Sequence, residues 1–316
     1  MKIAITGANG YLGTRLVQLL RKKHDILAID IINSNLGMAH EIIFKKIDLC
    51  CLEKLEKVIP SDIDLLIHLA GVVGVKPCEE NKKRAFILNV KATEVLARVC
   101  HKYQIPIILP TSIAVLGKPI SFPITENHSR KPSTYYGQTK LLAEKYVAKI
   151  AEKSFPAVSL MITNMYGHHI FDQKFIIGNY GVINNYYLNL KSNKELIINR
   201  PGTQKLNFIH VKDVADCFVF AIQKMNHLKN GLNTYIIGST DVYSVNQLAS
   251  CIRDITKGFK KKVRFKYSKI VIDKKLVFPN FIINANKAQK DLGFKAKINL
   301  KNGLYELFST ILKTPA

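Results

Sequence analysis

The chain has 316 residues, 47% of them hydrophobic, and a formal net charge of +24 at pH 7. This is enough apolar sequence for one large core or two unequal ones, and no stretch approaches the ~18 apolar residues that a membrane span needs. Met1 leads directly into an apolar stretch and a glycine-rich turn, which is typical of a first buried strand and not of a signal peptide. We therefore expect a cytoplasmic protein with no membrane contact.

The first half of the chain alternates short apolar runs with helical patterns. The run from Leu65 to Ala70 is apolar except for His68, as expected of a parallel strand covered on both faces. Strands are predicted at residues 3–6, 25–30, 42–47, 65–70, 106–110 and 157–162, and helices at 12–22, 52–58, 85–103 and 136–151. This alternation predicts an α/β fold with a doubly wound parallel sheet, the Rossmann fold.

After Asn164 the pattern loosens, with only weak helical periodicity from Gly167 to Asn193. Two further strands, Phe208–Val211 and Asn233–Ile237, are expected to return to the main sheet, with a helix at residues 213–223 between them. We therefore predict a nucleotide-binding domain of residues 1–165, rejoined by about 206–238. Residues 166–205 with 239–316 would form a smaller C-terminal substrate-binding domain.

A G-x-x-G-x-x-G turn follows the first predicted strand and opens the first helix. It reads Gly7-Ala8-Asn9-Gly10-Tyr11-Leu12-Gly13. Glycines there permit a tight turn and let backbone amides approach a pyrophosphate at a helix N-terminus. This context predicts dinucleotide binding through Gly7, Asn9, Gly10, Tyr11, Leu12 and Gly13; a turn needed only for packing is the alternative.

Asp30 ends the second predicted strand, where a carboxylate can accept hydrogen bonds from both hydroxyls of an adenosine ribose and repel a 2′-phosphate. No arginine follows directly, and so NAD is the predicted cofactor. Asp48 and Leu49, after the third strand, could contact the adenine, but Asp48 could equally cap the helix at Leu52.

Tyr136 and Lys140 form a Y-x-x-x-K pattern on a predicted helix, where residues four apart share one face. A lysine beside a tyrosine lowers the pKa of the phenol, which allows proton exchange with a hydroxyl or carbonyl near neutral pH. The pair lies between two predicted strands, which favours a catalytic role over an ordinary helix surface.

These motifs together resemble the extended short-chain dehydrogenase/reductases, the NAD-dependent nucleotide-sugar epimerase/dehydratase family. Besides the glycine turn and the Tyr136–Lys140 pair, the resemblance rests on His68-Leu69-Ala70-Gly71, Asn89-Val90 with Thr93, Thr111-Ser112 with Val115-Leu116-Gly117, Glu144, Asn164-Met165-Tyr166-Gly167, and Phe208-Ile209-His210-Val211 with Asp213-Val214-Ala215.

The resemblance implies roles for individual residues. Ser112 would hydrogen-bond the reacting oxygen beside Tyr136, and Lys140 would also hold the nicotinamide ribose. Leu69, Ala70 and Gly71 would line the nicotinamide side, with Asn89 supporting the helix and its nearby water. Asn164 would meet the diphosphate or sugar of a nucleotide-sugar substrate.

The chain departs from the family pattern mainly at positions concerned with the substrate. Ile113 and Ala114 follow Ser112, where similar dehydratases and decarboxylases carry acidic residues. Leu116 replaces a common tyrosine, and Asn284 an aspartate. Met161 and Leu206 stand where many relatives have arginines, which makes the diphosphate site differ from the usual one.

The leading interpretation is an NAD-dependent nucleotide-sugar epimerase acting at C4 through a keto intermediate. A 4-keto-sugar nucleotide reductase using the same residues is the alternative. The resemblance also implies a homodimer formed by the helices at 89–103 and 136–151, with apolar residues at Val95, Val99, Leu142, Tyr146 and Ile150.

A non-catalytic NAD- or RNA-binding protein is a third interpretation, suggested by the basic cluster from Lys257 to Lys266. Phe259, Phe265 and Tyr267 interleave with it, as in some single-stranded RNA sites. Because the lysines are spread along the whole chain, we interpret most of them as a solvated surface, and nucleic acid is not the expected partner. The six cysteines have no C-x-x-C spacing, and so they predict free thiols and no metal site.

Overall fold

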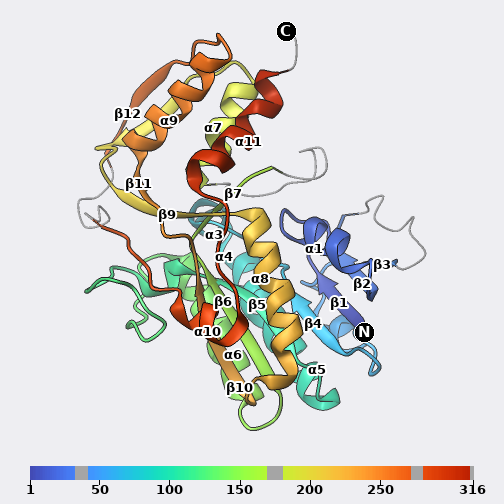
Figure 1. The fold of residues 1–316 in the computed structure, drawn as a ribbon. Helices are drawn as coiled ribbons and strands as arrows, with labels where there is room; N and C mark the ends of the chain where they lie inside the picture. The colour runs from blue at the N-terminus through green and yellow to red at the C-terminus, as the bar shows by residue number, and fades with distance from the viewer. Residues whose placement is uncertain (33–41, 169–180, 272–279, 314–316) are drawn as a thin grey trace.

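A computed structural model describes residues 1–32, 42–168, 181–271 and 280–313 (Figure 1). Its centre is a parallel seven-stranded sheet in the order β10-β6-β5-β4-β1-β2-β3. The strands are β1 (Lys2–Thr6), β2 (Asp25–Asp30), β3 (Ile42–Lys46), β4 (Leu65–His68), β5 (Ile107–Ser112), β6 (Pro156–Ile162) and β10 (Gly231–Ile237). The predicted doubly wound sheet is confirmed.

Helices cover both faces of this sheet because its strands are apolar on both. In β1, Ile3 and Ile5 pack into one core and Ala4 into the other. The first core is completed by α1 (Gly13–Leu20), α8 (Val211–Lys224) and α10 (Asn286–Leu292), and the second by α2 (Leu52–Leu55), α5 (Ala92–Tyr103) and α6 (Tyr135–Ala151). Two short helices, α3 (Val75–Glu80) and α4 (Lys82–Phe86), follow β4.

A smaller part of the molecule has its own core beyond the carboxyl ends of the main strands. In Figure 1 its helices gather at the top. It contains the three-stranded sheet β11 (Val242–Ser244), β9 (Lys205–His210), β7 (Asn164–Tyr166), the two-stranded sheet β12 (Phe265–Val271), β8 (Leu196–Arg200), and α7 (Gly181–Lys191), α9 (Val245–Gly258) and α11 (Leu300–Leu312).

One strand prediction is wrong. The segment Phe208–Val211 does not join the main sheet: β9 pairs with β7 and β11 instead, and Val211 is the first residue of α8. The free edge of β6 is occupied by β10, as predicted for Asn233–Ile237. Phe208 packs into the smaller core and Ile209 into the main one, so β9 connects the two.

The helix predicted at residues 85–103 is interrupted. A π-helical turn, Ile87–Lys91, separates α4 from α5 and contains the buried Asn89. Such turns are rare and often occur at functional sites. Among the described residues, no helix is long and apolar enough to cross a bilayer, and no group of three or more potential metal ligands is found.

Candidate active site

The glycine turn after β1 is closed so tightly that side chains would not fit. Gly7 has a φ of 70°, and a Cβ on it would lie 2.7 Å from the Ala70 backbone nitrogen. A Cβ on Gly13 would collide with the Gly7 carbonyl oxygen. Gly10 donates its amide to that same carbonyl, 3.0 Å away, and the buried Leu12 directly precedes α1. The N-terminus of α1 therefore opens from a compact backbone turn, as an anion site at a helix N-terminus requires.

Two side chains of this turn reach beyond it. Asn9 donates its side-chain amide to the Ile32 carbonyl, which ties the turn to the end of β2. The phenol of Tyr11 donates to the Gly167 carbonyl at 2.7 Å, just after β7. The glycine turn therefore contacts both the main sheet and the segment that leads into the smaller part of the molecule.

Asp30 lies at the carboxyl end of β2, facing the glycine turn. Its two carboxylate oxygens accept from the backbone amides of Asn9, at 2.9 Å, and Ile32, at 3.1 Å. A carboxylate has about four lone-pair sites, so two remain for the hydroxyls of a ribose. The geometry therefore suits the predicted role.

Asp48 and Leu49 have local structural partners. The Asp48 carboxylate accepts from the Cys50 amide at 2.9 Å and lies 3.8 Å from the Arg84 guanidinium. Leu49 is buried in the core behind the sheet. Since Cys51 is the residue preceding α2, Asp48 stabilises the turn before this helix and is not its cap.

Ser112 and Tyr136 come together although they lie on different elements. Ser112 ends β5, and its hydroxyl accepts from the Ala114 amide at 3.2 Å. At the start of α6, Gly137 packs so closely on Ala114 that a Cβ would lie 2.5 Å from its carbonyl oxygen. This close approach brings the Tyr136 phenol near the Ser112 hydroxyl. Desolvation raises the pKa of Tyr136 to about 12, and the nearby Ser112 hydroxyl opposes this rise.

Lys140 follows Tyr136 by one helical turn on α6. Burial of its ammonium lowers the pKa of Lys140 to about 8, an effect partly opposed by the neighbouring Cys78. A cation beside a desolvated phenol favours the phenolate, since each charge compensates the loss of water around the other. In the free protein, the raised pKa of Tyr136 keeps its phenol protonated near neutral pH.

The loop after β4 runs beside this pair. A Cβ on Gly71 would lie 2.9 Å from the Asn89 side-chain oxygen and 3.4 Å from the Lys140 ammonium. The Asn89 amide accepts from the Val72 backbone nitrogen at 2.7 Å and donates to the Val72 carbonyl at 3.0 Å and to Thr139 at 3.1 Å. Asn89 thus joins the loop to α6 as a brace, while Ala70 and Gly71 face the site with their backbone and Leu69 packs on the main core.

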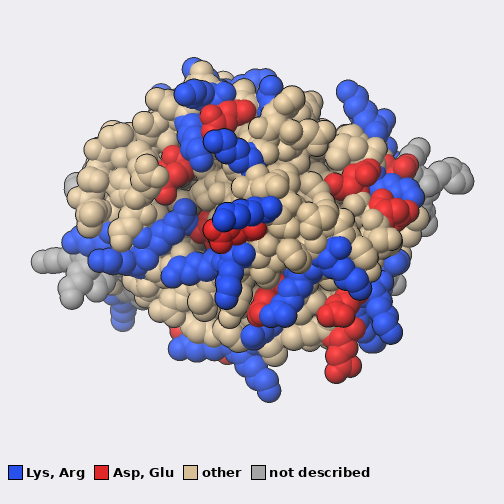
Figure 2. Space-filling model, turned by 90° about the horizontal axis from the view of Figure 1, so that it is seen from below, with Lys and Arg blue, Asp and Glu red and all other residues tan. Residues whose placement is uncertain are grey.

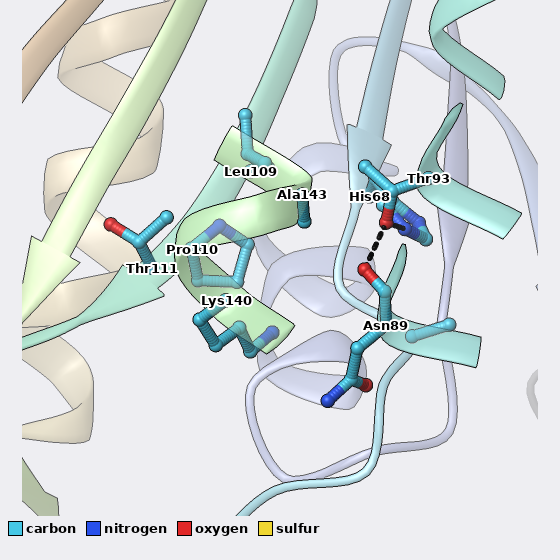
Figure 3. Close-up of a pocket in the computed structure, with 9 residues that line it drawn as sticks. His68, Asn89, Thr93, Leu109, Pro110, Thr111, Lys140 and Ala143 are labelled. Atoms are coloured by element: carbon cyan, nitrogen blue, oxygen red, sulfur yellow. Dashed lines mark hydrogen bonds between the residues drawn. The ribbon is translucent and has the colours of Figure 1, made fainter. Parts of the chain in front are cut away.

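Figure 3 shows the cavity beneath Lys140, whose side chain extends from α6 toward Asn89. It measures about 10 Å³ and is lined by Lys140, Asn89, His68 and Thr93 among others. This is close to the volume that one water molecule needs.

Asn164, expected to meet the substrate, donates its side-chain amide to the Asn207 carbonyl at 2.8 Å. It therefore connects β7 with β9 at the carboxyl edge of the sheet. After Ser112, Ile113 and Ala114 form part of a 3-10 turn and have no ionisable side chain.

The apolar departures from the family pattern lie within packed clusters. Leu116 and Met161 belong to one apolar cluster with Ile236 and Phe281. Leu206 packs against the core of the smaller part. A charged arginine would be strongly disfavoured at the buried Met161, because burying an unpaired charge costs several kcal/mol, whereas Leu206 is only partly buried.

Residues 3–238 match the sequence model of the NAD dependent epimerase/dehydratase family. The chain belongs to this family. Among family members, a putative UDP-glucose 4-epimerase of Methanocaldococcus jannaschii is 28% identical over 96% of this chain and 95% of its own length.

Two solved structures of epimerases share the fold over nearly their whole length. The UDP-glucose 4-epimerase of Thermotoga maritima has a TM-score of 0.85 at 21% identity, with 99% of each chain covered. The UDP-glucuronic acid 4-epimerase of Bacillus cereus, solved with UDP-glucuronic acid and NAD, has a TM-score of 0.82 at 22% identity, again with 99% of each chain covered.

Sequence reasoning assigned no role to His68, Thr6, Thr93 or Cys78, all of which are buried at this site. A signal for His68 was present, because it is the single polar residue in an otherwise apolar run. Thr93 also lies four residues after Asn89, on the same helical face. Nothing in the sequence marks Cys78, whose thiol contacts the Val72 carbonyl at 3.4 Å.

Proposed function

We propose that the protein is an NAD-dependent 4-epimerase of a nucleotide sugar. The observation that carries this proposal is that Ser112, Tyr136 and, one helical turn on, Lys140 lie together at the carboxyl edge of a dinucleotide-type sheet. Ile113 and Ala114 offer no acid or base, which disfavours dehydration and decarboxylation. The named activities of the similar proteins agree with this choice.

The chain's own residues fit NAD. At Gly7 and Gly13 the turn has no room for side chains, as a close approach of backbone to a pyrophosphate requires. Asp30 has lone pairs left for the two hydroxyls of the adenosine ribose. We propose that the amides at the start of α1 face the pyrophosphate, with Ala70 and Gly71 on the nicotinamide side. When bound, NAD accepts a hydride from the sugar carbon and returns it.

Tyr136 carries out the proton chemistry in this proposal. Its phenolate, favoured by Lys140, takes the proton of the sugar C4 hydroxyl as the carbonyl forms. Ser112 donates a hydrogen bond to the same oxygen and opposes its charge. After the keto sugar has rotated in the site to present its other face, Tyr136 returns the proton to the keto oxygen. Asn164, after β6, would contact the sugar or its diphosphate.

The substrate proposal is tested by incubating the protein and NAD with UDP-glucose, UDP-glucuronic acid and other sugar nucleotides, followed by NMR of the products. We expect the C4 epimer, and Tyr136→Phe should abolish turnover while leaving the dissociation constant for NAD within about threefold, since one phenol hydroxyl contributes little to cofactor binding. A 6-deoxy-4-keto sugar or a pentose as product, or full activity of Tyr136→Phe, would contradict the mechanism. Release of oxidised cofactor at every turnover would instead identify a reductase.

We further propose that the protein is a homodimer paired through α5 and α6. Leu142 on α6 is 40% exposed, and Val95, Tyr146 and Ile150 are only partly buried. Val99 does not belong to this surface, because it is buried in the core. For the compartment we propose the cytoplasm, consistent with six free thiols.

The RNA interpretation has less support. Of the three aromatic residues among the Lys257–Lys266 lysines, Phe259 and Phe265 pack on the core of the smaller part, and only Tyr267 is largely exposed. On the opposite side of the molecule from α9 and β12, which Figure 2 shows, the other Lys and Arg side chains are spread out with acidic residues between them. A stacking platform for bases is therefore not assembled from this cluster.

A further inference from the structure

His68 is a polar residue at the end of an otherwise apolar strand, and its side chain is buried against the active site. It is 4% exposed and ends β4. Its Nδ1 lies 2.7 Å from the Thr6 hydroxyl at the end of β1, and its Nε2 lies 2.9 Å from the Thr93 hydroxyl on α5. Both ring nitrogens thus have a partner, and both partners are hydroxyls that can donate or accept.

The outer contacts of the two threonines decide where the protons lie. Thr93 must donate to the Asn89 carbonyl at 2.8 Å, because a carbonyl only accepts, and so its oxygen accepts from His68 Nε2–H. Thr6 accepts from the Ala70 amide at 3.3 Å, which leaves its own proton for His68 Nδ1. The result is one directed chain from the Ala70 amide through the imidazole to the Asn89 carbonyl.

This chain holds the two segments that flank Lys140. At one end is Ala70, next to Gly71, which approaches both the Lys140 ammonium and Asn89. At the other end is the π-helical turn, which directs the Asn89 side chain to the loop and to α6. His68, Asn89, Thr93 and Lys140 also line the same cavity (Figure 3).

The ring also stays neutral beside a cation. Burial and, to a smaller extent, the charge of Lys140 lower the pKa of His68 to about 3. The other titratable groups of the site, Cys78 and Tyr136, do not contribute to the shift of the His68 pKa. Because the chain starts at a backbone amide and ends at a backbone carbonyl, it cannot pass a proton onward. Its action is to orient groups.

We propose that His68 is a positioning residue: as the neutral Nε2–H tautomer held between Thr6 and Thr93, it fixes the Ala70–Gly71 backbone and the Asn89 turn around Lys140. This inference rests on the proposed function, since Lys140 and the nicotinamide-side loop act there in catalysis. Loss of the chain would loosen the surroundings of Lys140 and slow the chemical step more than it weakens substrate binding.

Three substitutions separate positioning from packing. His68→Asn keeps an acceptor near the Nδ1 place, His68→Gln keeps a donor near the Nε2 place, and His68→Phe keeps only the volume. We expect kcat to fall about tenfold in His68→Asn and His68→Gln, which each lose one hydrogen bond, and about 100-fold in His68→Phe, which loses two. These values assume about 1.4 kcal/mol for each hydrogen bond. KM should stay within about threefold in all three variants. A residue that only fills space would give the reverse order, with His68→Phe the most active, and that order would overturn the proposal.

A second measurement needs no substrate. Its result for the His68 tautomer therefore does not depend on whether the proposed substrate is correct. In ¹⁵N NMR of the NAD-bound protein, His68 should show a protonated Nε2 and an unprotonated Nδ1 throughout pH 6 to 8. Thr93→Val should alter this signal, whereas Thr256→Val should not. Thr256 is the matched control, a buried helical threonine that donates to the Arg253 carbonyl at 2.9 Å on α9. An Nδ1–H tautomer, or titration of His68 near its ordinary pKa, would refute the assignment.

Discussion

Replacing Lys140 by methionine should make the cofactor-free protein more stable at pH 7, although it removes a residue proposed to be catalytic. The pKa of Lys140 is lowered from 10.5 to about 8 because its ammonium is desolvated. At 1.36 kcal/mol per pKa unit this corresponds to a cost of about 3 kcal/mol for a fully buried charge. Part of the side chain remains exposed, and screening reduces the expected gain of Lys140→Met to about 1–2 kcal/mol.

The pH dependence of this difference has a defined sign. Between about pH 8 and 10.5 the unfolded chain keeps the Lys140 proton while the folded protein releases it. The unfolded state therefore binds more protons in this window, and the stability of the wild type rises with pH relative to Lys140→Met. The advantage of the variant is full below about pH 8 and disappears as the pH rises through 10.5.

The assay is thermal and urea unfolding of both proteins at pH 7, 8.5 and 10, without cofactor. At pH 7 the melting temperature of Lys140→Met should be about 2–5 °C higher than that of the wild type. Lys145→Met, on the exposed side of the same helix, is the control and should change stability by less than about 0.5 kcal/mol. With saturating NAD the order should reverse, because Lys140 is proposed to hold the ribose. A destabilised Lys140→Met at pH 7, or a difference that does not change with pH, would refute the reasoning.

Three further substitutions test the remaining roles. Asp30→Ala should weaken NAD binding about 10- to 100-fold, because hydrogen bonds to a charged group are lost. In titration calorimetry the variant should also lose the preference of the wild type for NAD over NADP. Tighter binding of NADP than of NAD by the wild type would contradict the assignment. Ser112→Ala should reduce kcat about 10²- to 10³-fold with the C4 epimer still the product, the usual loss for one donor to a developing oxyanion. Leu142→Glu should convert the dimer to a monomer in sedimentation velocity, and a monomeric wild type would exclude the dimer.

Features that depend on neighbouring residues could be predicted from the sequence. The glycine turn, the strand ending at Asp30 and the pair Tyr136–Lys140 each occupy a few consecutive positions or one helical turn, so their spacing carries the geometry. The structure brings each of them to the same edge of the sheet, as a parallel sheet requires.

Features that depend on distant partners could not be predicted. The placement of Phe208 in a separate sheet depends on β10 already occupying the edge of β6, a competition between segments far apart in sequence. The π-helical turn around Asn89 likewise has no local signal, because the sequence Ile87–Lys91 continues the helical pattern of its neighbours. The proton order through His68 required the contacts of both Thr6 and Thr93.

Thr6 connects the glycine turn to the loop beside Lys140. Thr6 directly precedes Gly7, and it accepts from Leu69 through its carbonyl, at 3.0 Å, and from Ala70 through its hydroxyl, at 3.3 Å. A side chain at Gly7 would push against the Ala70 amide, so a change in the glycine turn would also move the loop beside Lys140. We therefore expect the proposed cofactor contacts and proton transfer to be coupled, because the glycine turn and the loop beside Lys140 cannot shift independently. Because Ile113 and Ala114 add no second acid or base to this site, it is suited to moving one hydride and one proton at a single carbon.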